Sequence, residues 1–180
     1  MNEPPLTPTG APATTALLVI DVQQALFEQK TPVYAADHLL CAINRLIAQA
    51  RQVGAPVICF QHINKGILRE AAPGWRLHPA LNVAADDCLM TKRYGSAFKA
   101  TVLHDTLQAY DISTLVVCGL TTHGCVRATC KDALGLGYRV VLVADAHSSY
   151  AQDAARHIDQ WNRKLGDQGA RVLAAQQIIF

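Results

Sequence analysis

The sequence has little charge and no long apolar runs. Only 17% of its 180 residues are charged, and 16 basic against 14 acidic side chains leave a formal net charge of +2. Because the basic residues form no block, we expect no nucleic-acid partner. The apolar runs are too short to span a bilayer, and the N-terminus carries no charged segment followed by an apolar signal core. We therefore expect a protein without a membrane partner.

The six cysteines show neither the CxxC pairs of a zinc site nor the spacing of a disulfide framework. Scattered thiols of this kind favour a reducing compartment, so we expect a cytoplasmic location. Four of them, Cys41, Cys59, Cys88 and Cys118, lie inside apolar patterns. We expect these four to be small buried core residues.

Short apolar runs alternate with amphipathic segments along most of the chain. The runs predict strands at 16–20, 56–60, 87–91, 114–118, 138–144 and 170–173, of which those at 16–20, 114–118 and 138–144 are expected to be buried. Apolar residues at helical spacing predict helices at 34–53, 103–110, 126–134 and 153–165. This alternation is typical of a three-layer α/β/α fold with a mostly parallel, about six-stranded central sheet.

Two segments fall outside the alternation. Residues 1–14 hold four of the eight prolines and predict a flexible N-terminal arm, which leaves 15–180 as a single domain. Residues 65–87 form a long irregular segment, and a loop of this length inside a domain is usually functional and often forms the wall of a site. Trp75, within this loop, either lines a pocket or plugs the edge of the core.

Three predicted strands lead into side chains that can take part in chemistry. Asp21 and Lys92 directly follow strands, and Cys125 stands where the strand at 114–118 hands over to a helix. The carboxyl ends of parallel strands share one edge of the sheet, where ligands bind. A helix N-terminus favours a thiolate, so we expect a lowered pKa for Cys125 and a thiol more reactive than the other five. Asp21 taken alone could equally be a helix cap or a turn former.

Four segments stand in order along the chain: ALLVIDVQ (16–23), KRYGSAFKATVL (92–103), LVVCGLTTHGCVRAT (115–129) and DALGLGYRVVLVADAHSS (132–149). In these segments the sequence resembles the isochorismatase-like cysteine hydrolases, a family that includes nicotinamidases, carbamoylsarcosine amidohydrolase-like enzymes and isochorismatases. The resemblance implies a catalytic triad of Asp21, Lys92 and Cys125. It also implies a non-proline cis peptide bond between Leu120 and Thr121, with the N–H groups of Thr121 and Cys125 as an oxyanion hole.

The mechanism implied by the resemblance is a thiol attack on a carbonyl carbon. Asp21 accepts the proton of Cys125, Lys92 pairs with Asp21, and water cleaves the resulting thioester. Because Cys125 is present, we expect hydrolysis of a C–N bond in a small-molecule amide or ureide. A vinyl-ether hydrolase of the isochorismatase type and a catalytically silent binding module are the alternative interpretations. We also expect a homo-oligomer, either a dimer or a tetramer.

The sequence departs from the nicotinamidase pattern at 62–64. Nicotinamidases carry an Asp-x-His metal pair there, whereas this chain has His62-Ile63-Asn64. One neutral histidine with an asparagine is a weak ligand set for Zn²⁺, so we expect no metal, no cofactor and a substrate other than nicotinamide. The residues expected to line the substrate pocket are Gln23, Phe27, His62, Trp75 and His123. Of these, His123 could instead cover the end of the helix.

Overall fold

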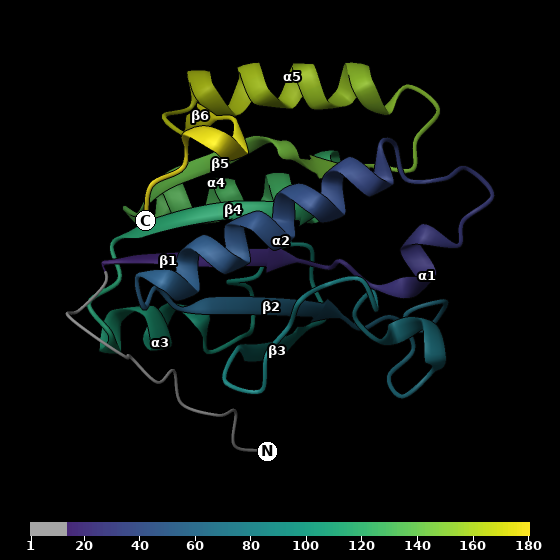
Figure 1. Cartoon of the computed structure of the whole chain (residues 1–180), viewed down its shortest axis with the longest axis horizontal. Helices are drawn as coiled ribbons and strands as arrows, with labels where there is room; N and C mark the ends of the chain where they lie inside the picture. The colour runs from purple at the N-terminus through teal and green to yellow at the C-terminus, as the bar shows by residue number, and fades with distance from the viewer. Residues whose placement is uncertain (1–13) are drawn as a thin grey trace.

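A six-stranded parallel sheet forms the centre of the protein (Figure 1). The computed structural model describes residues 14–180, so residues 1–13 of the predicted arm lie outside the described part. The strands are β1 (Thr15–Ile20), β2 (Val57–His62), β3 (Cys88–Lys92), β4 (Thr114–Leu120), β5 (Arg139–Ser148) and β6 (Arg171–Leu173). They lie in the order β3-β2-β1-β4-β5-β6, and each neighbouring pair is parallel. The chain order reverses between β1 and β4, where open sheets of this kind bind ligands.

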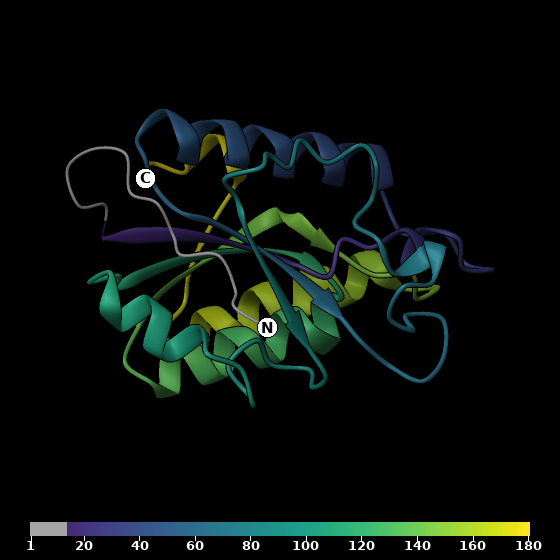
Figure 2. The same cartoon turned by 90° about the horizontal axis from the view of Figure 1, so that it is seen from below.

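Helices cover both faces of the sheet, which confirms the predicted three layers (Figure 2). One face carries α2 (Ala36–Gln52) and the 3-10 turn η3 (Ala175–Gln177), and the other carries α3 (Leu103–Ala109), α4 (Arg127–Gly135) and α5 (Ala154–Asp167). Two short elements that were not predicted, α1 (Gln24–Phe27) and η1 (Pro73–Trp75), lie beyond the carboxyl ends of the strands. Among the helices of residues 14–180, none combines the length and the apolar composition needed to cross a membrane.

The side chains of β1 alternate between two cores. Leu17 and Val19 pack with α2, whereas Leu18 and Ile20 pack with α3 and α4, and all four are fully buried. A strand covered on both faces must be apolar on both, which is why the segment reads as a continuous hydrophobic run. Each of these aliphatic side chains contributes about 1.5–3 kcal/mol through burial. The core therefore holds the carboxyl end of β1, and with it Asp21, in one place.

The burial predicted for the four structural cysteines is right for three of them. Cys59, Cys88 and Cys118 are buried, but Cys41 is exposed. Cys41 lies in α2, where successive residues turn by about 100° and apolar neighbours therefore face the sheet while Cys41 faces outward. No disulfide joins any of the six cysteines, all of which lie in the described residues.

The long segment between β2 and β3 is tied to α2. Asn44 donates a hydrogen bond to the Ala80 carbonyl (2.7 Å) and accepts one from the Asn82 N–H (2.9 Å). Arg51 forms an ion pair with the buried Asp87 and donates to the Asn82 carbonyl (2.7 Å). These contacts hold the segment against α2 as it returns to the amino end of β3, which Asp87 directly precedes.

Candidate active site

Cys125 lies in a sharp turn at the carboxyl end of β4. The turn is η2 (Thr122–Val126), a short π-helical segment that leads into α4. The Leu120–Thr121 peptide bond before it is cis, as the family resemblance implied. Gly119 has φ of +112°, and a Cβ atom there would lie 2.1 Å from the carbonyl oxygen of Ile20. Glycine is therefore required where β4 passes the end of β1.

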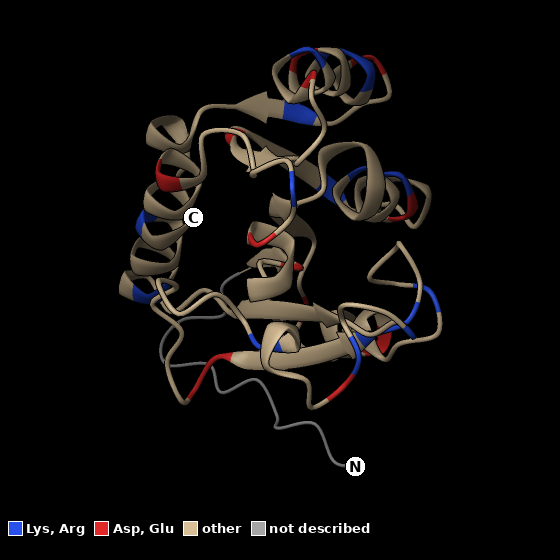
Figure 3. Ribbon diagram, turned by 90° about the vertical axis from the view of Figure 1, so that its right-hand side faces the viewer, with Lys and Arg blue, Asp and Glu red and all other residues tan. Residues whose placement is uncertain are grey.

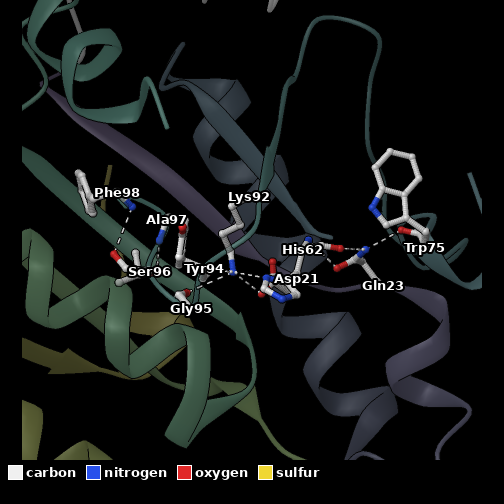
Figure 4. A network of polar contacts seen from close by, with 11 residues as sticks. Asp21, Gln23, His62, Trp75, Lys92, Tyr94, Gly95, Ser96, Ala97 and Phe98 are labelled. Atoms are coloured by element: carbon white, nitrogen blue, oxygen red, sulfur yellow. Dashed lines mark hydrogen bonds and ion pairs between the residues drawn. The ribbon is translucent and has the colours of Figure 1, made fainter. Parts of the chain in front are cut away.

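Asp21 and Lys92 form a buried ion pair (Figure 4). Lys92 Nζ lies 2.7 Å from Asp21 Oδ2, and both residues are only 2% exposed. The ammonium also donates to the backbone carbonyls of Tyr94 (3.1 Å) and Gly95 (3.2 Å). These three oxygens match the three N–H groups of a lysine, so the buried charge is compensated.

The thiol of Cys125 lies beside this pair. Cys125 Sγ, a carboxylate oxygen of Asp21 and a ring nitrogen of His62 all lie within 4.8 Å of one another. Asp21 Oδ1 is buried and has no conventional hydrogen-bond partner among the described residues. Its lone pairs are therefore available to the thiol, with which the carboxylate interacts. The structure thus brings together the three side chains that the sequence analysis singled out.

Burial dominates the ionisation of this cluster. It raises the pKa of Asp21 above the ordinary value, although the Lys92 ammonium opposes the shift. Burial, together with the Asp21 carboxylate, raises the pKa of Cys125 to about 12, again against Lys92. The expectation of a lowered Cys125 pKa is therefore wrong, because the thiol is deeply placed and next to a negative charge. The resting state is a neutral thiol beside a strengthened base, which suits proton transfer during attack.

His62 enters the cluster from the carboxyl end of β2. Its Nδ1 lies 3.4 Å from Lys92 Nζ, and burial and the lysine charge both lower the pKa of His62, so that the ring is uncharged at neutral pH. The backbone N–H of His62 donates to Gln23 Oε1 (2.8 Å). Gln23 Nε2 in turn donates to the backbone carbonyls of Trp75 (2.7 Å) and His62 (3.2 Å), as Figure 4 shows. Gln23 is fully buried. It is a scaffold for His62 and Trp75 and not the pocket wall that was predicted.

The remaining predicted pocket residues have partners outside the charged cluster. The Phe27 ring packs at a tilt against the His78 ring, with 4.4 Å between ring centroids. The His123 ring lies 5.0 Å from the His157 ring, and its Nδ1 lies 3.5 Å from Ser149 Oγ. Both Phe27 and His123 are half-buried, so their side chains are within reach of solvent.

Among the described residues, Asp21, His62 and Cys125 form a group whose side chains are close enough together to hold a metal ion. A dication there would lie beside the Lys92 ammonium, which is 2.7 Å from Asp21 and 3.4 Å from His62, and repulsion between the two charges disfavours it. The Asn64 side chain is engaged in its own loop, since its Oδ1 accepts hydrogen bonds from the backbone N–H groups of Gly66 (2.8 Å) and Leu68 (3.0 Å). The absence of a metal stays a prediction.

Two parts of the site were missed in the sequence. Tyr94 and Gly95 hold Lys92 through backbone carbonyls, which leave no side-chain signal. The side chain of Thr122, in the Cys125 turn, contacts the buried His147 of β5. The signal for this contact in the sequence was a histidine three residues past the predicted strand at 138–144, inside the segment that carries the family resemblance.

Comparison with known proteins decides the family. Residues 15–177 match the model of the isochorismatase domain. The chain belongs to the isochorismatase family. Within this family it is 37% identical over 145 residues to streptothricin hydrolase from Streptomyces noursei, a match that covers 79% of this chain and 52% of that protein.

A second relative in the family matches over nearly its whole length. Maleamate amidohydrolase from Pseudomonas putida is 32% identical over 187 residues, with 91% of this chain and 86% of that protein covered. The fold resembles the crystal structure of an isochorismatase from Pseudomonas putida KT2440, with a TM-score of 0.85 at 28% identity, covering 95% and 94% of the two chains. This isochorismatase-family chain spans about half the length of the streptothricin hydrolases that it matches.

Proposed function

We propose that this isochorismatase-family protein is a metal-independent cysteine hydrolase that cleaves a C–N bond in a small-molecule amide or ureide. The observation that carries the proposal is the buried Asp21–Lys92 ion pair, 2.7 Å long, with the Cys125 thiol beside it. Burying two charges is costly, and a base, a cation and a nucleophile together are what cysteine hydrolysis needs. Relatives that are named streptothricin hydrolase and maleamate amidohydrolase support amide chemistry.

In the proposed first half-reaction, Cys125 Sγ attacks the substrate carbonyl carbon while its proton passes to Asp21 Oδ1. The N–H groups of Thr121 and Cys125 donate to the oxyanion that forms. The C–N bond then breaks, the leaving nitrogen takes the proton from Asp21, and the acyl group stays on sulfur as a thioester. Lys92 keeps the carboxylate oriented and stabilises its charged form.

In the second half-reaction water replaces the amine. The oxygen of a water molecule attacks the thioester carbon while Asp21 accepts a proton from that water, and the C–S bond breaks. The proton returns from Asp21 to the sulfur, which restores the neutral thiol. One base thus serves both steps, because the raised pKa of Asp21 lets it accept a proton and release it again.

The test is a panel of primary amides and ureides, including maleamate and ureidoacrylate, assayed for release of ammonia or amine. We expect Cys125→Ala to reduce turnover of any substrate to background. Cys59→Ala, the same change at a buried strand cysteine, should leave turnover intact. Mass spectrometry of the enzyme quenched during turnover should find the acyl group on Cys125. Turnover of isochorismate alone, or full activity of Cys125→Ala, would contradict the proposal.

Brief treatment with iodoacetamide gives a second test that needs no known substrate. Cys41 is exposed, so the experiment uses a Cys41→Ser background. We expect the label on Cys125 before Cys59, Cys118 or Cys130, because each of those is fully buried, whereas Cys125 is only partly buried and lies beside the Asp21 base. Asp21→Asn removes the base and should slow the labelling of Cys125.

A further inference from the structure

A buried histidine that the proposed mechanism does not use lies behind the Cys125 turn. His147 is 2% exposed and stands on β5 opposite Gly119 of β4. Its Nδ1 lies 2.9 Å from the hydroxyl of Thr122, and its Nε2 lies 2.8 Å from Oδ1 of Asn162 in α5. Thr122 is itself 1% exposed and opens the turn η2 that contains Cys125.

The direction of each hydrogen bond in this group follows from its partners. Asn162 Nδ2 donates to the Ala144 carbonyl (3.2 Å), so Oδ1 is the atom turned toward His147. Oδ1 can only accept, and Nε2 of His147 must therefore carry the hydrogen. Burial lowers the pKa of His147, and the uncharged ring then has an acceptor at Nδ1. The Thr122 hydroxyl donates to that acceptor, which completes a directed chain from Thr122 through His147 and Asn162 to β5.

The turn η2, at which these hydrogen bonds begin, is not a regular helix. Gly124 has φ of −104° and ψ of −108°, outside the helical region. Within the turn, the N–H groups of Gly124 (3.0 Å) and Val126 (3.2 Å) both bond to the carbonyl of Thr121. These bonds tie the turn to itself, whereas the Thr122 side chain ties it to β5 and α5. Neither of those elements contributes Asp21, Lys92 or Cys125.

We propose that His147 is a positioning residue that holds the Cys125 turn in its reactive geometry through the Thr122 hydroxyl. The inference rests on the proposed function, because it assigns His147 a role only if Cys125 is the nucleophile. A histidine is suited to this task, since one flat ring accepts from Thr122 on one side and donates to Asn162 on the other. Misplacement of a reacting group by about 1 Å costs about 100-fold in rate.

The first experiment compares Thr122→Val with Tyr138→Phe. Thr122→Val keeps the shape of the side chain and removes the hydroxyl from His147. Tyr138→Phe removes a hydroxyl that also contacts a histidine: the Tyr138 hydroxyl lies 2.9 Å from Nδ1 of His104, next to the amino end of β5. Tyr138 is also buried, so both variants lose a comparable contact.

We expect Thr122→Val to slow iodoacetamide labelling of Cys125 by about 10- to 100-fold. For an amide that the panel identifies, kcat should fall by a similar factor with KM nearly unchanged. Tyr138→Phe should leave both within about twofold of the wild type, a small free-energy change. If the two substitutions had equal effects, or if Thr122→Val had no effect while Cys125→Ala is inactive, the role of His147 would be overturned but the proposed function would stand. Full turnover by Cys125→Ala would overturn the proposed function itself.

The second experiment uses a cavity that His147 borders. This cavity has a volume of about 280 Å³ and lies between α2, β5 and α5, where Tyr34, His38 and Ile158 also line it. In His147→Ala the space left by the ring joins this cavity. Added imidazole can occupy that space and supply both an acceptor and an N–H donor. 1-Methylimidazole has the acceptor but no N–H donor, so it is the matched control probe.

We expect imidazole to restore about tenfold of the lost labelling rate in His147→Ala, corresponding to about 1.4 kcal/mol. It should restore little in Thr122→Val, and 1-methylimidazole should restore little in either variant. The double variant Thr122→Val/His147→Ala should be no slower than the slower single variant, because one residue acts through the other. Additive losses, no rescue by imidazole, or equal rescue by both probes would overturn the proposal.

Discussion

The two ends of the parallel sheet differ in how they hold polar side chains. At the carboxyl end, Asp21, Lys92 and His147 are each only 2% exposed. At the amino end, Arg139 donates hydrogen bonds to Thr114 and Ser113 (both 2.9 Å) at an exposed position. Figure 3 views the molecule from the carboxyl end and shows charged residues of both signs on the surrounding helices and loops.

This difference shows where the fold bears an energetic cost. A buried charge must be fully compensated, whereas an exposed polar contact changes stability by only about 0.5 kcal/mol. The carboxyl end compensates its charges with two backbone carbonyls and an ion pair around Lys92. Such an arrangement adds little to stability and is best explained by the chemistry proposed for it.

The largest effect should come from exchanging one cation at each end for methionine. Lys92→Met keeps the length of the side chain but leaves Asp21 without its partner, and we expect turnover to fall at least about 100-fold. Arg139→Met should leave turnover and stability nearly unchanged. Steady-state kinetics of the two variants, with circular dichroism to check folding, make the comparison. Comparable losses of activity at both ends would contradict the assignment of the carboxyl end as the site.

A related series asks whether the buried residues act as one unit. Lys92→Arg should recover only part of the activity, because a planar guanidinium does not replace a compact ammonium in a closed site. Asp21→Asn should lose about as much activity as Cys125→Ala, and the double variant should be scarcely worse than either. Additive losses would indicate that Asp21 and Cys125 act in separate steps.

Substituting a glycine by alanine should also cost more stability at the carboxyl end of the sheet than at the amino end. Gly119 and Gly137 both have positive φ, but a Cβ at Gly119 would lie 2.1 Å from the Ile20 carbonyl oxygen, whereas one at Gly137 would meet nothing within 4 Å. We expect Gly137→Ala to lower the free energy of unfolding by about 1 kcal/mol and Gly119→Ala by about 3 kcal/mol or more. Urea unfolding measures both values. An equal loss in the two variants would indicate that β4 and β1 separate easily at their carboxyl ends.

The pH dependence of activity should reflect the ionisation of the buried Asp21 at the carboxyl end of the sheet. Because the pKa of Asp21 is raised, its ionisation opposes folding: the stability that protonated Asp21 contributes is present below its ordinary value of 3.8 and is lost as pH rises through the folded value. Activity needs the ionised form, so the acid limb of kcat/KM should lie above pH 3.8. Lys92 lowers the pKa of Asp21, so Lys92→Met should move the limb of its residual activity upward, while Arg139→Met should not move it. A limb at or below 3.8 would contradict a buried aspartate base.

The smallest effect should come from metal removal. Treatment with a chelator should leave turnover unchanged, because Lys92 already places a positive charge beside Asp21 and His62. Elemental analysis of protein purified without added metal provides the independent measurement. Stoichiometric zinc or iron that is lost together with activity would show that the cation of this site is a metal.

Much of the fold could be predicted because strand and helix periodicity are local properties of the chain. The buried strands and the long stripe of α2 follow directly from the spacing of apolar residues. The predicted strand at 138–144 is longer in the structure, Arg139–Ser148, because pairing with β4 continues past a register shift to His147 and Ser148. Such an extension depends on the neighbouring strand and not on hydropathy.

The sequence by itself determined which reactive side chains stand at the carboxyl ends of β1, β3 and β4, because strand ends and motifs can be read along the chain. Only the tertiary structure decided that Asp21 and Lys92 lie 2.7 Å apart, that Gln23 is buried and that Cys41 is exposed. It also decided the direction in which the pKa of Cys125 shifts, since burial and the neighbouring Asp21 carboxylate raise it against the opposing Lys92 ammonium. Distances and burial arise from packing between segments that are far apart in sequence, and local spacing carries no information about them.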